Sequence, residues 1–196
     1  MNYFEVFGLE RRLVIDEELL QRRFYELSRR HHPDFHQAAA PADQARALAA
    51  SALVNAAYRT LRDPIARVDY LVRLEEGRET REGAPAKPKA PPALLQEMFE
   101  IQEALQDAKA GGLGAADRKA LAAERERLLV RYRDEEARLT GPLSDAWDAG
   151  GPAEHSRLLA ELKDGLATLA YLRTVIDDLG SVLDGDQETH VTHRRH

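Results

Sequence analysis

Apolar residues recur along this chain at intervals of three and four, the spacing that places them on one face of an α-helix. In the first third of the sequence, this pattern predicts helices over residues 3–7, 16–31 and 41–62, and a shorter one after residue 64. Pro33 ends the second helix because a residue that precedes proline is pushed out of the helical region. The predicted core positions are Leu20, Phe24 and Leu27; Val54, Ala57, Tyr58 and Leu61; and Val68, Leu71 and Val72.

Residues 76–92 interrupt the helical pattern and are predicted to be a linker. Four of the nine prolines of the chain fall within this segment. Proline lacks the backbone N–H that a helix needs, so the segment is expected to be extended. The sequence therefore predicts two domains, an N-terminal one over residues 1–75 and a C-terminal one over residues 93–184.

The C-terminal domain contains three longer helical segments, predicted over residues 93–110, 115–139 and 152–183. Their apolar positions are Leu94, Met98, Ile101 and Leu105; Leu121, Leu128, Tyr132 and Leu139; and Leu158, Leu162, Leu169, Leu172, Ile176, Leu179 and Leu183. Long amphipathic helices joined by short breaks are typical of an antiparallel three-helix bundle. Residues 185–196 are expected to be a disordered tail, and no segment has the pattern of a strand. The fold class is therefore predicted to be all-α.

Composition and charge exclude several classes of protein. Of the 196 residues, 43% are hydrophobic and 32% are charged, and no apolar run reaches the roughly 18 residues of a membrane span. The chain begins without a basic and apolar leader, so a cytoplasmic location is expected. Because there is no cysteine, disulfides, thiolate catalysis and cysteine metal sites are excluded. The net charge of −6, without a concentrated basic face, argues against nucleic-acid binding.

The most unusual local cluster is the segment HHPDFH at residues 31–36. Because proline ends the preceding helix, His32 and Asp34 are expected on a loop at its tip, next to Arg29 and Arg30. A rigid charged loop beside a basic helix end is suited to docking an acidic partner. Two other interpretations are open at this point. The arginines form an ordinary solvated helix face, or the histidines and Asp34 bind a metal for hydrolysis.

This cluster and its flanking segments resemble the J-domain family. Residues 2–9, NYFEVFGL, are similar to its opening helix, and residues 55–64, NAAYRTLRDP, are similar to the end of its third helix. The resemblance implies that the loop and the basic face of the second helix dock on an Hsp70 and stimulate its ATPase. The implied contacts are His32, Pro33, Asp34, Arg22, Arg23, Arg29 and Arg30. Many family members have lysine after the aspartate, where this chain has Phe35.

On the first helix after the linker, Leu95 and Phe99 lie about 100° away from the core stripe. The carboxylates of Glu100 and Glu103 lie beside them. Two interpretations are equally open: the apolar pair forms a protein-binding patch rimmed by carboxylates, or it widens the core face. Tyr171, on the last helix, faces either the same side or the core.

Residues 94–105, LLQEMFEIQEAL, resemble the client-binding helix of the HscB-type co-chaperones of iron–sulfur cluster assembly. The resemblance covers residues 2–184 and implies that the C-terminal domain binds an IscU-type scaffold protein and delivers it to an HscA-type Hsp70. The implied scaffold contacts are Leu95, Phe99, Glu100, Glu103 and Tyr171. Gln96 stands where relatives often have an apolar residue. The N-terminal cysteine pairs of eukaryotic relatives are absent, which favours a bacterial-type member.

The protein is therefore predicted to be an adaptor without catalytic residues, cofactor or metal of its own, which binds neither nucleic acid nor membrane. The sequence contains no phosphate-binding loop, nucleophile triad or paired-carboxylate cleft. Two alternatives remain: a J-protein that binds a different client, and a metal-dependent hydrolase that uses residues 31–36. The tail histidines His190, His193 and His196 could chelate a metal, although a solvated tail is the simpler expectation.

Overall fold

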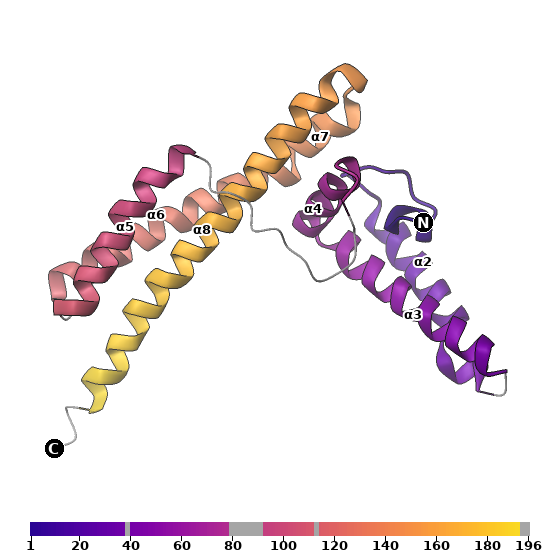
Figure 1. Ribbon diagram of the computed structural model, residues 1–196, viewed down its shortest axis with the longest axis horizontal. Helices are drawn as coiled ribbons and strands as arrows, with labels where there is room; N and C mark the ends of the chain where they lie inside the picture. Colours follow the sequence, from indigo (N-terminus) through magenta and orange to yellow (C-terminus); the bar gives the residue numbers. More distant parts are fainter. Residues whose placement is uncertain (38–39, 79–91, 112–113, 193–196) are drawn as a thin grey trace. The chain divides into compact units, whose positions relative to one another are not determined.

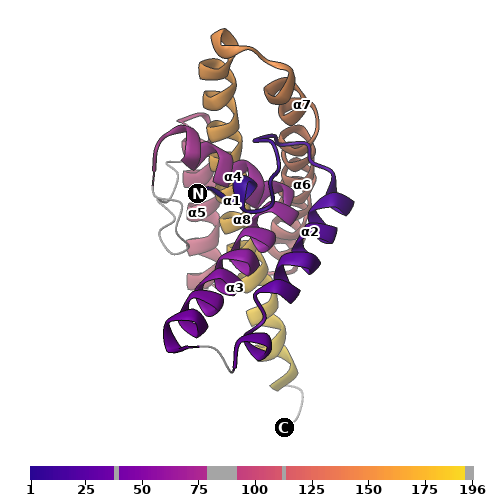
Figure 2. The same ribbon diagram turned by 90° about the vertical axis from the view of Figure 1, so that its right-hand side faces the viewer.

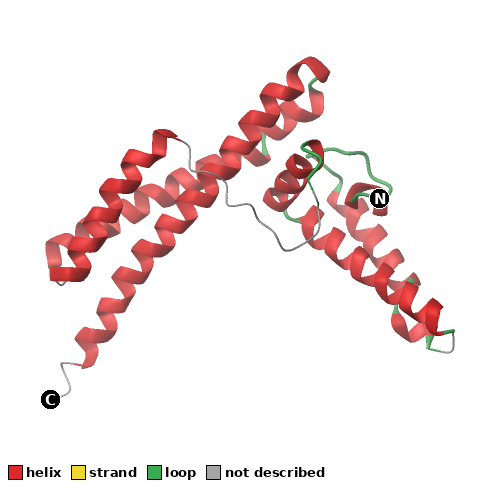
Figure 3. Ribbon diagram, viewed as in Figure 1, coloured by secondary structure: helices red, strands yellow, loops and turns green. Residues whose placement is uncertain are grey.

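The computed structural model describes residues 1–37, 40–78, 92–111 and 114–192. Within these ranges, the side chains at positions 33, 36, 92, 93, 95, 98, 105, 107–111 and 185–192 are not described. In chain order, the described helices are α1 (Tyr3–Val6), α2 (Glu17–Arg30), the 3₁₀ helix η1 (Pro33–His36), α3 (Pro41–Arg62), α4 (Pro64–Glu75), α5 (Pro92–Gly111), α6 (Ala115–Thr140), α7 (Pro142–Ala149) and α8 (Pro152–Thr192). All regular structure in the described residues is helical (Figures 1 and 3), which confirms the predicted fold class. None of the described helices is long and apolar enough to cross a membrane.

Several helices are preceded by an N-cap residue, whose side chain accepts a backbone hydrogen bond from the first turn of the helix. The Asn2 side chain accepts the backbone N–H of Glu5 at 3.0 Å, and the Glu5 carboxylate accepts the backbone N–H of Asn2 at 2.9 Å. Asp16 and Asp63 cap α2 and α4, each accepting the backbone N–H three residues further on, at 2.8 and 2.9 Å. Such a cap contributes about 1 kcal/mol to helix stability, so local sequence sets where these helices start.

The described chain separates into two compact units. The first comprises residues 1–84 and 139–162, and the second comprises residues 85–138 and 163–196. This division differs from the predicted domains, which ended the first domain at residue 75 and assigned all of residues 139–162 to the C-terminal domain. The predicted linker, residues 76–92, lies mostly outside the described residues.

In the first unit, α2 and α3 lie side by side and form the expected helical hairpin (Figures 1 and 2). Leu20 of α2 and the α3 residues Val54, Ala57 and Leu61 are buried, as the apolar pattern predicted. Phe24 and Tyr58, the partly buried members of the same stripes, stack with ring centroids 3.9 Å apart. Each large apolar side chain that is fully buried contributes about 1.5–3 kcal/mol, so this shared face holds the hairpin together.

The short helices α1 and α4 flank the hairpin and are joined to each other by aromatic residues. Tyr3 of α1 stacks on Tyr70 of α4 with ring centroids 4.4 Å apart, and its backbone N–H donates to the Tyr70 hydroxyl at 2.7 Å. Phe4 and Phe7 are almost completely buried in the same core. The hydroxyl of Tyr70 therefore accepts a hydrogen bond from a buried backbone group at the start of α1.

The helix α7 joins the first unit and was not predicted. Its Leu143 and Trp147 are buried, and the carboxylate of Asp148 accepts the backbone N–H groups of Leu13 and Val14, both at 2.8 Å. Hydrogen bonds to a charged acceptor are stronger than neutral ones, so Asp148 fastens α7 to the segment that leads into α2. An eight-residue helix spans too few turns for its apolar periodicity to be recognised from the sequence.

In the second unit, α5, α6 and the later part of α8 bury a common apolar cluster. Its buried members are Leu94, Ile101, Leu121, Leu128, Tyr171, Leu172, Val175, Ile176 and Leu179. Most of these belong to the stripes that the sequence predicted for the three helices. Met98 and Leu105 belong to the predicted stripe of α5 as well, but their side chains lie outside the described ones.

The last helix is longer than the sequence indicated. A disordered tail was predicted from residue 185, whereas α8 continues to Thr192. No proline occurs between residues 153 and 192, so nothing removes a backbone N–H from the helical hydrogen-bond ladder. The histidine at position 190 falls within this helix, and those at 193 and 196 lie outside the described residues.

Candidate functional site

The tripeptide His32-Pro33-Asp34 forms a hydrogen-bonded turn after α2. Pro33 starts η1, and His32 is its N-cap, with φ −64° and ψ 131°. This extended backbone is the conformation that a proline imposes on the residue before it. The backbone N–H of Phe35 donates to the His32 carbonyl at 3.1 Å and closes the first turn of η1. The sequence HPDF thus produces both the end of α2 and the shape of the turn.

The turn also orients the His32 imidazole. Its Nδ1 accepts the backbone N–H of Asp34 at 3.3 Å. The Asp34 carboxylate lies 3.5 Å from Nδ1 and accepts a hydrogen bond from the Gln37 amide at 3.4 Å. Because the His32 and Asp34 side chains are 52% and 71% exposed, both are accessible to a partner.

The four predicted arginine contacts of α2 divide into two groups. Arg22, Arg29 and Arg30 are exposed, and Arg22 is 3.9 Å from Glu18 in a surface ion pair. Arg23 differs because its guanidinium donates to the carbonyls of Phe7 and Gly8, the latter at 2.7 Å. Arg23 therefore binds the backbone that ends α1, a structural contact that the sequence did not predict.

An exposed aromatic residue on α2 was missed from the sequence. Tyr25 is 59% exposed and lies three residues after Arg22 and four before Arg29, so the three share one helix face. The position of Tyr25 outside the stripe of Leu20, Phe24 and Leu27 is the signal that could have identified it. The accessible face of α2 thus combines positive charge with an aromatic ring.

The second candidate surface is on α5. Phe99 is 69% exposed, and Glu100 and Glu103 are exposed as well. Gln96 donates from its amide to the Glu100 carboxylate at 3.2 Å. Of the two interpretations of this helix, the exposure of Phe99 supports a surface patch and not a wider core face. The side chain of Leu95, the other predicted apolar contact, lies outside the described ones.

Tyr171 does not share this surface. Its side chain is 8% exposed and belongs to the buried cluster of the second unit, and its role as a scaffold contact stays a prediction. Its position beside Leu172 on α8 turns the ring inward. The Tyr171 hydroxyl has no hydrogen-bond partner among the described residues. Burial raises the pKa of Tyr171, and the negative charge of Glu97 raises it further.

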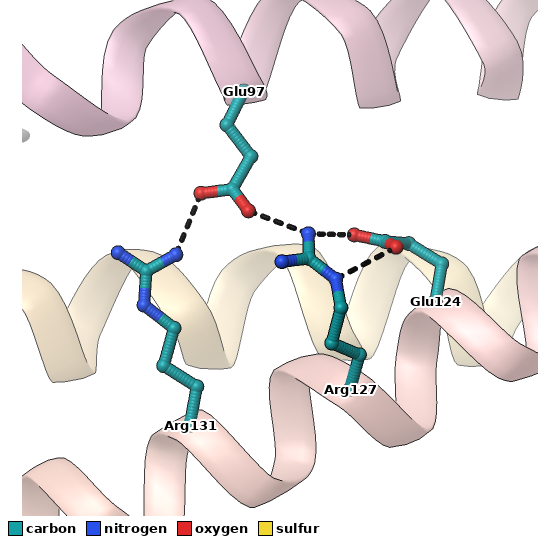
Figure 4. A network of polar contacts seen from close by, with 4 residues as sticks. All are labelled: Glu97, Glu124, Arg127 and Arg131. Atoms are coloured by element: carbon teal, nitrogen blue, oxygen red, sulfur yellow. Dashed lines mark hydrogen bonds and ion pairs between the residues drawn. The ribbon is translucent and has the colours of Figure 1, made fainter.

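A network of ion pairs joins α5 to α6 through Glu97, two residues before Phe99 in the sequence, and the sequence did not predict it (Figure 4). The Glu97 carboxylate accepts hydrogen bonds from Arg127 at 2.6 Å and from Arg131 at 2.7 Å. Arg127 also donates to Glu124, at 2.5 and 3.0 Å. Partial burial on its own would raise the pKa of Glu97, but the hydrogen bonds from the two arginines outweigh it and lower the pKa.

The described side chains contain no group of three or more histidine, aspartate or glutamate residues arranged to hold a metal ion. The alternative metal site at residues 31–36 includes His36, whose side chain is not described. The described residues do provide two exposed candidate surfaces: a histidine–aspartate turn next to arginines, and a phenylalanine among carboxylates.

Comparison with known proteins identifies the class. A family model described as the DnaJ domain matches residues 2–70, which contain the α2–α3 hairpin and the exposed His32-Pro33-Asp34 turn. Residues 2–70, most of the first unit, are therefore a J-domain. The co-chaperone protein HscB homologue of Vibrio vulnificus is 33% identical over 166 residues, covering 84% of this chain and 94% of the relative. The Vibrio cholerae homologue is 34% identical over 171 residues, with the same coverage.

The chain belongs to the HscB family of J-domain co-chaperones, which act in iron–sulfur cluster assembly. It is thus an activator of a partner's ATPase and not an enzyme itself. The solved structure of chaperone HscB from Vibrio cholerae matches with a TM-score of 0.61 at 29% identity, covering 94% of this chain and 99% of that one. Human HscB matches with a TM-score of 0.59 at 24% identity, covering 92% and 81%, a likeness that concerns the fold.

Proposed function

We propose that this protein stimulates the ATPase of an HscA-type Hsp70 through its J-domain and delivers an IscU-type scaffold protein bound on α5. The observation that carries the proposal is the turn at His32 and Asp34, whose functional groups are fixed by local hydrogen bonds and remain exposed. As a bacterial-type member, the protein would act in the cytoplasm, without a cofactor, a membrane or a nucleic acid as partner.

The J-domain surface is suited to an acidic partner. Arg22, Arg29 and Arg30 supply exposed positive charge that steers a negatively charged protein toward the turn. Once docked, the Asp34 carboxylate would accept a charge-assisted hydrogen bond from an arginine of the Hsp70. Pro33 keeps the turn rigid, so little conformational entropy is lost on docking. Arg23 would support this surface through its bonds to the end of α1 and not by direct contact.

The α5 surface is suited to a partner with an apolar anchor site surrounded by basic groups. Phe99 supplies the apolar contact, and Glu100 and Glu103 supply carboxylates at its rim. Leu95 would extend the apolar area, one helical turn before Phe99. Tyr171 would contribute from the core, by supporting α5 from beneath. Gln96 makes this patch less apolar than the corresponding helix of many relatives.

An ATPase assay of an HscA-type Hsp70 with this protein, in the presence and absence of an IscU-type scaffold, tests the proposal. We expect this protein alone to raise the ATPase rate and the scaffold to raise it further, because both surfaces would then be occupied. Stimulation without any response to the scaffold would instead indicate a J-domain co-chaperone for a different client. No stimulation at all would contradict the proposal.

A further inference from the structure

Phe35 stands out on the J-domain because it is 70% exposed and directly follows Asp34. Single exposed apolar residues are common on protein surfaces, so exposure alone has no functional meaning. The position of this ring is more informative, because η1 places it beside a side chain with a proposed function.

The geometry of the 3₁₀ helix pairs Phe35 with His32. Residues three apart eclipse each other in such a helix, whereas neighbouring residues point about 120° apart. Accordingly, the Phe35 ring lies edge-on to the His32 imidazole, with centroids 6.1 Å apart and ring planes at 71°. The bond from the Phe35 backbone N–H to the His32 carbonyl, at 3.1 Å, fixes this relation. Any partner that covers His32 therefore also covers Phe35.

We propose that Phe35 is a specificity-determining contact, which packs against an apolar patch on the partner Hsp70 next to the groups that bind His32 and Asp34. The inference rests on the proposed docking of this turn on an Hsp70. Dehydrating a phenyl ring stabilises a complex only if the opposing surface is apolar. A lysine at this position, as in many family members, would instead require an acidic group on the partner. Phe35 thus selects an Hsp70 by an apolar contact where lysine selects by charge.

The apolar contact is distinguishable from the charge contacts around it. Attraction between the exposed arginines of α2 and an acidic partner weakens as salt is added, because the charges are screened. Contact through Phe35 is not screened. The affinity that depends on Phe35 should therefore persist at a salt concentration that removes most of the contribution from Arg29 and Arg30.

The test uses the full chain with Phe35→Ala, Phe35→Leu and Phe35→Lys, and follows Hsp70 ATPase activity against co-chaperone concentration. For the alanine and lysine variants, we expect the concentration for half-maximal stimulation to rise about tenfold, the loss expected from removing one good interface anchor. Maximal stimulation should be unchanged, and leucine should retain most of the affinity. The rise should be similar at low and high salt. Because the ring is exposed, none of these changes removes a buried contact.

Val130→Ala, an exposed apolar truncation on α6, serves as the control and should behave like the wild type. A wild-type curve for Phe35→Ala would overturn the inference. Full activity of Phe35→Lys would also overturn it, because the partner would then present an acidic group. Loss of maximal stimulation at unchanged half-maximal concentration would place Phe35 in activation and not in docking. In the same assay, normal stimulation by His32→Gln would overturn the proposed function. Wild-type behaviour of the Phe35 variants would overturn only the inference about Phe35.

Discussion

Phe35 and Phe99 are exposed to nearly the same extent, 70% and 69%, yet their surroundings are held in place by different kinds of contact. The turn around Phe35 is fixed by neighbours in the sequence, since His32, Asp34 and Gln37 bond to one another within six residues. The helix that carries Phe99 is joined to α6 by the buried apolar cluster and by Glu97, whose arginine partners follow 30 and 34 residues later. One candidate surface is thus built by residues close in sequence, and the other depends on a second helix.

Because of this difference, we expect the two surfaces to respond to substitutions at different places in the sequence. Substitutions of the exposed side chains in the turn should change docking with little change in the rest of the first unit, because His32, Asp34 and Gln37 bond to one another. One further bond leaves the turn, from the Gln44 amide of α3 to the Gln37 carbonyl at 3.0 Å. Substitutions on α6, far from Phe99 in the sequence, should reach the α5 surface through Glu97. The two surfaces should also fail independently, because Phe35 and Phe99 belong to different compact units.

His32→Gln should have the largest effect. Glutamine removes the ring that the turn orients, and we expect ATPase stimulation of the partner Hsp70 to fall by more than about 30-fold, as for a central interface contact. Steady-state ATPase measurements test this. Helix content by circular dichroism and scaffold affinity by calorimetry should be unchanged. If scaffold affinity fell as well, the turn would not be an independent surface.

Phe99→Ala is the matching change on the other surface. Truncating an exposed ring that anchors a partner should weaken scaffold binding by about 10- to 100-fold, and adding Leu95→Ala should weaken it further. Calorimetric titration with the scaffold measures this, with Val130→Ala as the control for a neutral surface truncation. Stimulation of the Hsp70 without scaffold should remain at the wild-type level. Loss of both activities would indicate misfolding.

The locally built surface was also the one that the sequence predicted in most detail. Pro33, the cap residues and the apolar stripe of α2 are neighbours in sequence, so the turn and the exposure of His32 and Asp34 followed from them. The role of Glu97 could not be predicted, because its position on α5 does not reveal which arginines of α6 face it. Tyr171 was ambiguous for a similar reason: only the packing of three helices decides which side of α8 is buried.

The boundary of the first unit could not be predicted either, because it also depends on contacts between residues far apart in the sequence. Leu13 and Val14 carry no pattern that points to Asp148, about 135 residues later, and α7 is too short for its periodicity to stand out. The helices of the hairpin, by contrast, span several turns, and every residue of their predicted stripes is buried or partly buried. Long helices were therefore predictable from local pattern, whereas their assignment to one compact unit or the other was not.

Asp148→Asn tests whether the first unit, unlike its turn, depends on contacts between residues far apart in the sequence. The Asp148 side chain is 3% exposed, and its two backbone hydrogen bonds would lose the charged acceptor. We expect a loss of about 1–3 kcal/mol in the free energy of unfolding. Burial lowers the pKa of the Arg67 guanidinium, and the negative charges of Glu17, Asp63 and Asp148 partly offset this by raising it. The variant therefore also removes one of the charges that stabilise a buried guanidinium.

Urea unfolding measures that loss, and hydrogen exchange at the Leu13 and Val14 amides localises it, since both should exchange faster in the variant. Asp145→Asn, an exposed change on the same helix, is the matched control and should cost only a few tenths of a kcal/mol. Unchanged protection at the two amides would mean that Asp148 does not hold this segment in solution.

Glu97→Gln should have the smallest effect. It tests whether the ion pairs from Glu97 to Arg127 and Arg131 of α6 help to position the α5 surface. Arg127 and Arg131 are partly exposed, so the pairs are screened and the variant should lose only about 1 kcal/mol at neutral pH. Because the pKa of Glu97 is lowered in the folded protein, its stabilisation is complete above the unfolded carboxyl pKa of about 4.3. The stabilisation is lost as the pH falls through the lower folded value.

The stability difference between wild type and Glu97→Gln should therefore be constant near neutral pH and disappear in acid, which thermal unfolding across this range can follow. Glu126→Gln, an exposed change on α6, controls for the general loss of a carboxylate. Scaffold affinity should fall about two- to threefold at neutral pH, because α5 would be held less firmly against α6 while Phe99, Glu100 and Glu103 are all retained. A stability loss without any change in affinity would mean that the apolar core alone positions the α5 surface, and the contrast between Phe35 and Phe99 would then be one of stability and not of function.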